Sequence, residues 1–140
     1  MKDNLFLLDT SAWILALGKS AQPLVTDRVR KLLEEKTIAV TPMVALELLG
    51  GVRTLEDFNR LKGRLDALYQ IPVGKKQWEE AARMAYQLRR KGKALPNTDI
   101  LIATVALEAG AILVHADQHF DMLAGITGLT VESLLPLFSQ

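Results

Sequence analysis

The sequence predicts an α/β fold in which helices cover both faces of a parallel sheet. Short apolar runs of three or four residues alternate with longer stretches in which apolar residues recur every three or four positions. Pro, Gly or helix-capping residues stand at most of the transitions between these stretches. Strands separated by helices form βαβ units, whose strands run parallel and are buried on both faces.

The composition fits one compact domain, and we expect residues 1–140 to form it. The chain is 49% hydrophobic and 24% charged, so intrinsic disorder is excluded. Its net charge is +1, so a nucleic acid would have to be bound by a local basic patch. The absence of cysteine excludes disulfide scaffolds, zinc fingers and thiol nucleophiles. No signal peptide or membrane span is predicted, so we expect a cytoplasmic protein without a membrane partner.

Local signals in the first half of the chain predict two strands and four helices. The capping residues Asp9 to Ser11 follow the first apolar run, and Pro23 and Pro42 suit first turns of helices. The pair Gly50 and Gly51 ends the helix that begins after Pro42. In order, we expect a strand at Leu5–Leu8, helices at Ala12–Leu17 and from Pro23 to Leu33, a strand at Thr37–Val40, and helices at Met43–Leu49 and Leu55–Leu68.

The second half repeats the alternation. Pro72 places one short strand at the edge of the sheet, because proline cannot donate a ladder hydrogen bond. Asn97 or Thr98 is expected to cap a helix that Gly110 closes. In order, we expect a strand at Ile71–Val73, helices at Gln77–Arg90 and Asp99–Ala109, a strand at Ala111–Val114, a short helix at Phe120–Leu123 and a strand at Leu129–Val131.

Four acidic residues stand at or near the ends of expected strands. Asp9 directly follows the first strand, and Asp117 follows the strand Ala111–Val114 by a few residues. Asp99 lies in a first helical turn, and Glu47 lies in the helix after the second strand. Each has a purely structural explanation, such as a cap, a turn or an ion pair. Ligands of an open parallel sheet, however, bind beyond the carboxyl ends of its strands, where all four acids can converge.

A cluster of carboxylates favours a divalent cation. Carboxylates packed together repel one another, and a bound cation removes the conflict. Because the chain has no cysteine and only two histidines, an all-oxygen site favours Mg²⁺ or Mn²⁺ over zinc.

Four motifs then make the chain similar to a known family. The segment Leu7–Ala12 resembles the opening motif of PIN domains, especially that of the VapC-like toxins of prokaryotic toxin–antitoxin pairs. Three further segments resemble those that carry the second, third and fourth acids of that family, in this order: Val44–Leu48, Asp99–Ala103 and Leu113–Asp117. The resemblance extends in order from residue 5 to about 132.

The resemblance implies a PIN-like three-layer α/β/α sandwich with a central parallel sheet of four to five strands. It implies a metal-dependent endoribonuclease in which Asp9, Glu47, Asp99 and Asp117 are catalytic and hold one or two Mg²⁺ or Mn²⁺ ions. It also implies that RNA is the substrate, that a small antitoxin protein inhibits the enzyme, and that two copies of the chain form a homodimer. The alternative is a catalytically silent PIN-like domain that binds RNA or a protein.

Other folds with the same alternation fit less well. A single acid follows the first strand, whereas a receiver domain needs a pair. Ser11 stands where a phosphatase with an aspartyl nucleophile would have its second aspartate.

Two residues depart from the family pattern. A hydroxyl residue is common in the family where this chain has His115, and a further acid where it has His119. Three roles remain open for His119: a metal ligand, a phosphate contact or a residue at a helix start. Asp121 could supply the missing charge. Thr10 or Ser11 would either cap a helix or place a hydroxyl near the metal or phosphate.

The sequence also suggests contact surfaces. Residues 81–98 contain five cations and no acid, so they would either guide an RNA backbone or form a solvated helix end. We expect Trp13 and Trp78 mainly in the core. An apolar helical face, together with Trp13, offers more surface than a small core needs and predicts the dimer contact. That face comprises Leu55, Phe58, Leu61, Leu65 and Leu68.

Overall fold

Five short strands form one sheet in the computed structural model, which describes residues 4–18 and 22–139. The strands are β1 (Leu5–Leu8), β2 (Thr37–Val40), β3 (Tyr69–Gln70), β4 (Ile112–His115) and β5 (Val131–Ser133). Their order is β3-β2-β1-β4-β5, and every neighbouring pair is parallel. The carboxyl ends of all strands therefore meet at one edge, as the sequence predicts.

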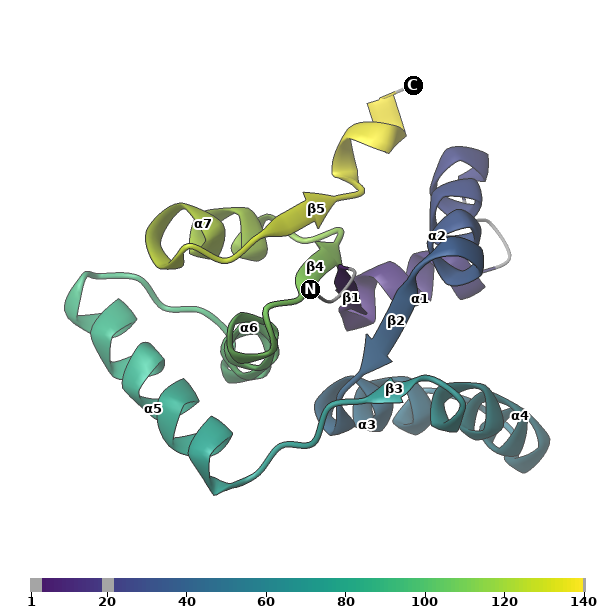
Figure 1. Ribbon diagram of the computed structural model, residues 1–140, viewed down its shortest axis with the longest axis horizontal. Coiled ribbons are helices and arrows are strands. Elements are labelled where there is room, and N and C mark those ends of the chain that lie inside the picture. The colour runs from purple at the N-terminus through teal and green to yellow at the C-terminus, as the bar shows by residue number, and fades with distance from the viewer. Residues whose placement is uncertain (1–3, 19–21, 140) are drawn as a thin grey trace.

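Helices cover both faces of this sheet, which confirms the predicted three-layer α/β/α architecture (Figure 1). In Figure 1, α1 and α2 lie on one side of the sheet and α5, α6 and α7 lie on the other, whereas α3 and α4 lie near β3. The helices are α1 (Thr10–Leu17), α2 (Pro23–Glu35), α3 (Pro42–Gly50), α4 (Leu55–Asp66), α5 (Lys75–Arg90), α6 (Asn97–Ala109) and α7 (Gln118–Thr127), followed by a 3-10 turn at Leu135–Ser139. Within the described ranges, no helix combines the length and apolar character needed to cross a bilayer.

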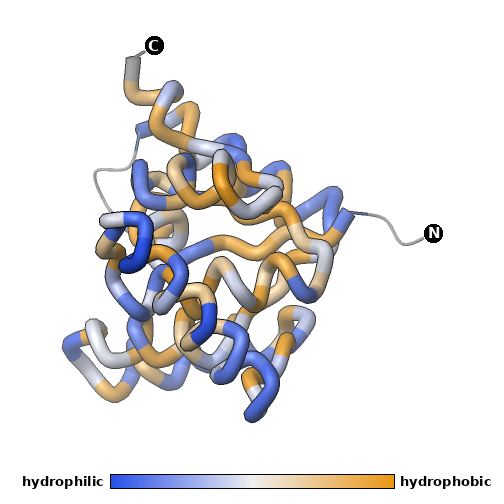
Figure 2. Tube along the Cα trace, turned by 90° about the vertical axis from the view of Figure 1, so that its left-hand side faces the viewer, coloured by the Kyte–Doolittle hydropathy of each residue, from blue (hydrophilic) through white to orange (hydrophobic). Residues whose placement is uncertain are grey.

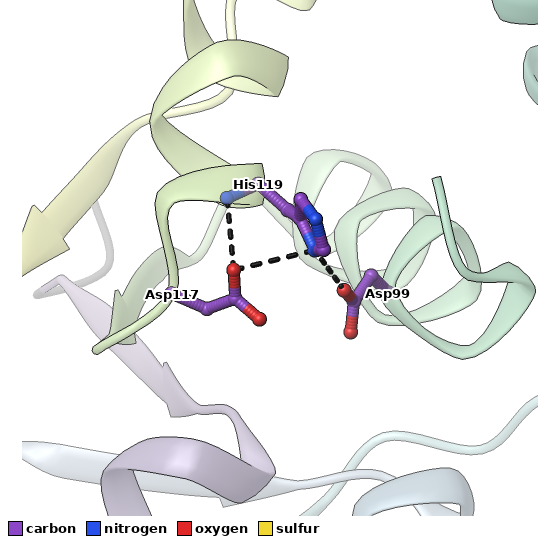
Figure 3. A group of neighbouring side chains, drawn as sticks. All are labelled: Asp99, Asp117 and His119. Atoms are coloured by element: carbon purple, nitrogen blue, oxygen red, sulfur yellow. Dashed lines mark hydrogen bonds and ion pairs between the residues drawn. The ribbon is translucent and has the colours of Figure 1, made fainter. Parts of the chain in front are cut away.

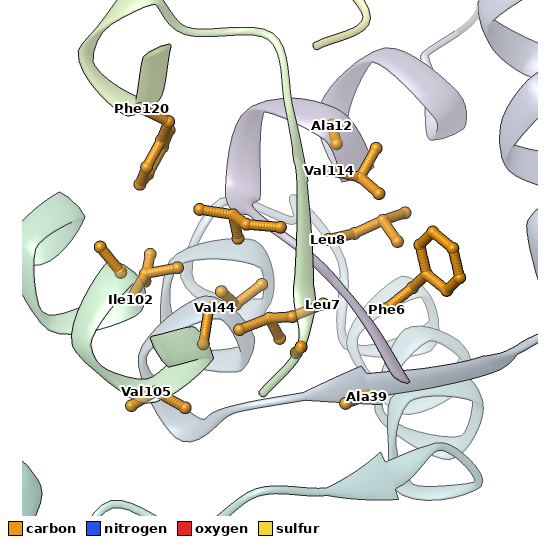
Figure 4. Close-up of a cluster of buried hydrophobic side chains, with 14 of the residues drawn as sticks. Phe6, Leu7, Leu8, Ala12, Ala39, Val44, Ile102, Val105, Val114 and Phe120 are labelled. Carbon is orange, nitrogen blue, oxygen red and sulfur yellow. The ribbon is translucent and has the colours of Figure 1, made fainter. Parts of the chain in front are cut away.

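The core lies on both sides of the central strands β1 and β4. Leu7 and Leu8 of β1 are fully buried and pack among residues of neighbouring strands and helices (Figure 4). Helix α6 is buried along residues 100–106 because it lies between the sheet and α5. Residues 100–106 are therefore apolar except for Thr104, whereas many helical turns in Figure 2 carry both hydrophobic and hydrophilic residues. Burying side chains of this size contributes about 1.5–3 kcal/mol each.

Two strands begin two residues away from their predicted positions. The strand predicted at Ile71–Val73 is β3, because the ladder ends with the bond from Ile71 N to Val40 O (2.9 Å) and Pro72 cannot continue it. The strand predicted at Leu129–Val131 is β5 at Val131–Ser133. It starts later because α7 extends to Thr127 and ends with Gly128 at a positive φ of 79°.

Helices α1 and α5 begin at Thr10 and Lys75, two residues before their predicted starts, and the starts of α6 and α7 differ in ways that affect the site. The short helix predicted at Phe120–Leu123 is the ten-residue α7, which Asp117 caps. Neither Asn97 nor Thr98 caps α6: the helix begins at Asn97, and Pro96 occupies the capping position.

The predictions for the large apolar side chains are partly wrong. Trp13 is buried as expected, but Trp78 is 57% exposed on α5. On α4, Leu65 is buried in the core and Leu55 is 74% exposed, so the predicted dimer face is divided between core and surface. Helical periodicity alone cannot show how far around a helix its neighbours reach.

Candidate metal centre

The first predicted site residue, Asp9, lies directly after β1 at the carboxyl edge of the sheet. Its carboxylate accepts a hydrogen bond from the Ala12 amide (2.9 Å) and thereby caps α1. The Ser11 hydroxyl lies 2.7 Å from both carboxylate oxygens and donates to them. Asp9 N also donates to Val114 O of β4 (3.0 Å). The carboxylate is therefore both a helix cap and a rigidly held group, only 3% exposed.

This burial changes the titration of Asp9. The pKa of Asp9 is raised from 3.8 to about 6, mainly by the loss of hydration on burial and to a smaller extent by the charge of Asp99. The hydrogen bonds from Ala12 and Ser11 oppose the shift without cancelling it. A nearby cation would stabilise the charged carboxylate, because these bonds compensate only part of its burial.

The turn between β4 and α7 carries another of the predicted acids, Asp117. Asp117 caps α7, and its Oδ1 accepts from His119 N (2.9 Å). His115 ends β4 and is fully buried, and its Nδ1 accepts from Asp117 N (3.1 Å), so Nε2 carries the ring proton. Nε2 lies 3.2 Å from Asp121 Oδ1 without a well-aligned hydrogen bond. Burial lowers the pKa of His115, which favours the neutral ring.

Asp99, Asp117 and His119 form a tight group at this edge (Figure 3). His119 Nδ1 lies 3.0 Å from Asp99 Oδ2 and 3.2 Å from Asp117 Oδ1. One potential ligand atom from each residue lies within 4.8 Å of the others, and no second group of this kind occurs within the described ranges. These three side chains are 17%, 37% and 39% exposed, respectively, so an ion from solvent can reach them.

Asp99 is the electrostatic centre of the site. Burial raises its pKa, and the charges of Asp117 and Glu47 raise it further, whereas the hydrogen bond with His119 lowers it. Asp99 also interacts with the charge of Asp9. Each of the other three predicted acids therefore lies close enough to interact with the charge of Asp99, although Asp9 and Glu47 lie outside the tight group.

Glu47 is exposed on α3 and is oriented by a neighbour. Thr10 Oγ1, from the first turn of α1, donates to Glu47 Oε1 at 2.6 Å. Its carboxylate thus lies on the solvent side of the site, where a substrate would approach.

The hydroxyl residues that follow Asp9 position the carboxylates. Ser11 Oγ donates to Asp9 and accepts from Ala116 N (3.0 Å), which joins the ends of β1 and β4. Ser11 and Ala116 are 105 positions apart, so no local pattern could reveal this contact. The sequence left capping and site roles open for Thr10 and Ser11, and both residues orient acids of the site.

The predicted basic segment includes the end of α5, which packs against α6. Arg83 pairs with Glu80, and the Arg90 guanidinium lies 5.8 Å from the centre of the Tyr86 ring. That this basic segment binds RNA stays a prediction.

Comparisons with known proteins identify the family. The sequence model of the PIN domain family matches residues 6–126. Ribonuclease VapC18 of Mycobacterium tuberculosis is 32% identical over 135 residues, which cover 94% of this chain and 96% of the relative. Ribonuclease VapC11 of the same species is 32% identical over 133 residues, covering 92% and 98% of the two chains.

Solved structures show the same fold. A chain in the structure of VapBC2 from Rickettsia felis, solved with a DNA fragment from its promoter, has a TM-score of 0.75 and 25% identity, covering 92% of this chain and 98% of that one. VapC20 of Mycobacterium tuberculosis, described as a sarcin-ricin loop cleaving toxin, has a TM-score of 0.62 and 19% identity, covering 84% and 94%. The fold is an α/β/α sandwich with acids at the carboxyl edge of its sheet, and both the family model and the relatives match most of the sequence. The chain therefore belongs to the PIN domain family, within its VapC group.

Proposed function

We propose that this protein is a metal-dependent endoribonuclease, the toxin of a toxin–antitoxin pair. The observation that carries the proposal is the group of Asp99, Asp117 and His119 ligand atoms, with the buried Asp9 beside it. Relatives that are named ribonucleases support RNA as the substrate. Residues 1–140 would act as a single PIN-like domain, working in the cytoplasm, where RNA is plentiful.

The donor set fits a divalent cation. Asp9, Glu47, Asp99 and Asp117 supply carboxylate oxygens, which Mg²⁺ and Mn²⁺ prefer. Burial raises the pKa of Asp9 and that of Asp99, so the fold compensates the charge of these carboxylates only in part. A bound cation would offset this cost, so we propose Mg²⁺ or Mn²⁺ as the cofactor.

Each acid has a distinct task in this mechanism. When bound, the ion lowers the pKa of a water molecule and stabilises charge on the phosphodiester under attack. Asp99 and Asp117 approach each other from α6 and α7 and would hold the ion. Asp9, held by Ser11 and Ala12, would present a fixed oxygen from the sheet side. Glu47, held by Thr10, would lie on the substrate side and coordinate directly or through water.

The test is cleavage of a single-stranded RNA with Mg²⁺ or Mn²⁺ and with EDTA. Removing a metal ligand costs several kcal/mol of transition-state stabilisation, so Asp99→Asn should lower the rate by about a thousandfold. Asp66→Asn, at the end of α4, is the matched control and should cleave normally. Full cleavage in EDTA or by Asp99→Asn would contradict the proposal. RNA binding without cleavage under any condition would favour the silent binding domain.

An antitoxin is the proposed protein partner, since similar structures include toxin–antitoxin complexes. A groove of about 620 Å³ between the end of α1 and the start of α4 suits an acidic, partly apolar tail. Arg53 and Arg64 line it together with Leu17 and Leu61, whereas the guanidinium of Arg60, which also lines it, is paired with Glu56 and Asp57. Arg64→Glu should weaken inhibition by a co-purified antitoxin, measured by titrating cleavage, and unchanged inhibition would exclude this groove.

We also propose a homodimer, now on a different surface from the predicted one. A groove of about 660 Å³ beside α5 is lined by the exposed Trp78 and Tyr86 and by small residues such as Ala82. Two antiparallel copies of α5 would place the acidic Glu79 and Glu80 of each copy opposite the basic last turn of the other. Light scattering should show a dimer that Trp78→Glu dissociates, whereas Tyr69→Glu on β3 should not. A monomeric wild type at micromolar concentration would contradict this assembly.

A further inference from the structure

We infer that His119 gives the bound ion an imidazole nitrogen and thereby makes the site prefer Mn²⁺ to Mg²⁺. This inference rests on the metal site proposed above and concerns the selectivity of that site. It assigns a ligand role to the residue at which this chain departs from the acidic family pattern.

The positions of the atoms support a shared ion. His119 Nδ1 lies 3.0 Å from Asp99 Oδ2 and 3.2 Å from Asp117 Oδ1. Neighbouring ligands of an octahedral ion with bonds of about 2.1 Å are about 3.0 Å apart. The nitrogen therefore lies as far from each oxygen as adjacent ligands lie from one another. Without an ion this nitrogen makes a hydrogen bond to Asp99, and a bound ion would take the place of its ring proton.

His119 is also held in place by its surroundings. Its backbone amide donates to Asp117 Oδ1 at 2.9 Å, which fixes the start of α7 relative to one of the proposed ligands. The next residue, Phe120, is fully buried and anchors the first turn of α7 in the core. The His119 side chain is 39% exposed, so solvent and ions can reach its ring.

The chain's other histidine cannot take this role. His115 is fully buried, and the lone pair of its Nδ1 accepts the Asp117 amide. Its Nε2 carries the ring proton and lies near Asp121, which is outside the tight group. Only His119 therefore offers a ring nitrogen toward the acids.

An imidazole ligand separates the two candidate ions. Mg²⁺ is a hard cation that prefers oxygen and loses water reluctantly, whereas Mn²⁺ binds nitrogen more readily. A site with a carboxylate in place of His119 would suit both ions. The imidazole should therefore raise the preference for Mn²⁺ by weakening the Mg²⁺ site.

The test is calorimetric titration of EDTA-stripped protein with MnCl₂ and, separately, with MgCl₂. His119→Asp should tighten Mg²⁺ binding and lower the ratio of the two dissociation constants by about tenfold. His119→Asn, which removes the imidazole without adding charge, should weaken Mn²⁺ binding by about tenfold and change Mg²⁺ binding by less than about threefold. Asp121→Asn, in the same first turn, is the control and should leave the ratio unchanged.

Thermal unfolding in EDTA shows that each variant folds, and the stabilisation by each ion gives a second measure of affinity. A ratio that is unchanged in both His119 variants, while Asp99→Asn abolishes ion binding, would overturn the role of His119 and leave the proposed metal site standing. A wild-type protein that binds neither ion would overturn both.

Discussion

The two aspartates that cap helices at the carboxyl edge of the sheet differ in their surroundings. Asp9 is 3% exposed and is held by the Ser11 hydroxyl and the Ala12 amide. The Asp117 side chain is 37% exposed and receives one hydrogen bond, from the His119 amide. Burial raises the pKa of Asp9 to about 6.

One local signal, an aspartate between a strand and a helix, therefore produces two different sites in this protein. Capping explains the backbone geometry of both residues. Burial decides the cost of their charges, and only Asp9 lies where that cost is large. We therefore expect the charge of Asp9 to lower the free energy of unfolding more than the charge of Asp117 does.

The largest expected effect is on catalysis. Both Asp9→Asn and Asp117→Asn should lower RNA cleavage by about a thousandfold, because each removes a charged ligand of the ion. At pH 8 only Asp9→Asn should also raise the free energy of unfolding, by up to about 3 kcal/mol, because asparagine keeps the cap without the buried charge. Urea denaturation in EDTA measures the free energy of unfolding of each variant. Equal stability changes in the two variants would remove the distinction between the sites.

The second effect is the pH dependence of stability without metal. The pKa of Asp9 is about 6 in the folded protein and 3.8 when unfolded, so the folded state binds the proton more tightly. Its contribution to stability is therefore complete below about pH 4 and is lost as the pH rises through about 6, by up to about 3 kcal/mol. The difference in unfolding free energy between wild type and Asp9→Asn should follow this curve. A difference that is constant from pH 4 to 8 would contradict the burial of Asp9.

A smaller effect is expected from Ser11→Ala. The variant loses the hydroxyl bond to Asp9 and leaves the Ala116 amide without its partner, which should cost about 1–2 kcal/mol of stability. Cleavage should fall by about tenfold, because Asp9 loses its orientation. Ser133→Ala removes a similar amide contact, to Leu135 N, and should affect stability alone. Equal activity in the two variants would show that Ser11 is only structural.

The smallest effect concerns Glu47, which is exposed. Thr10→Val removes its 2.6 Å hydrogen bond and should lower cleavage by about threefold, with the free energy of unfolding changed by less than about 0.5 kcal/mol. Thr26→Val on α2 is the control. If Thr10→Val lowered cleavage as much as Ser11→Ala does, the orientation of Glu47 would matter as much for cleavage as that of Asp9.

Local features of the sequence determined the α/β class, the parallel sheet and the edge at which the acids lie. Apolar periodicity, prolines, glycines and caps act over a few residues, and the strand–helix alternation leaves few topologies. Asp9 and Asp117 could be placed at strand ends because each lies within a few residues of its strand. The resemblance to a family then suggested the chemistry of the four acids.

Only the tertiary structure decided how these elements meet. His119 touches Asp99, 20 positions away, because α7 packs against α6, and Ser11 reaches the Ala116 amide because β1 pairs with β4. The exposure of Trp78 and the burial of Asp9 likewise depend on which neighbours cover them. Hydropathy and capping act within one segment, whereas burial, pKa and ligand distances depend on atoms from several segments, so these properties appear only when the chain is packed.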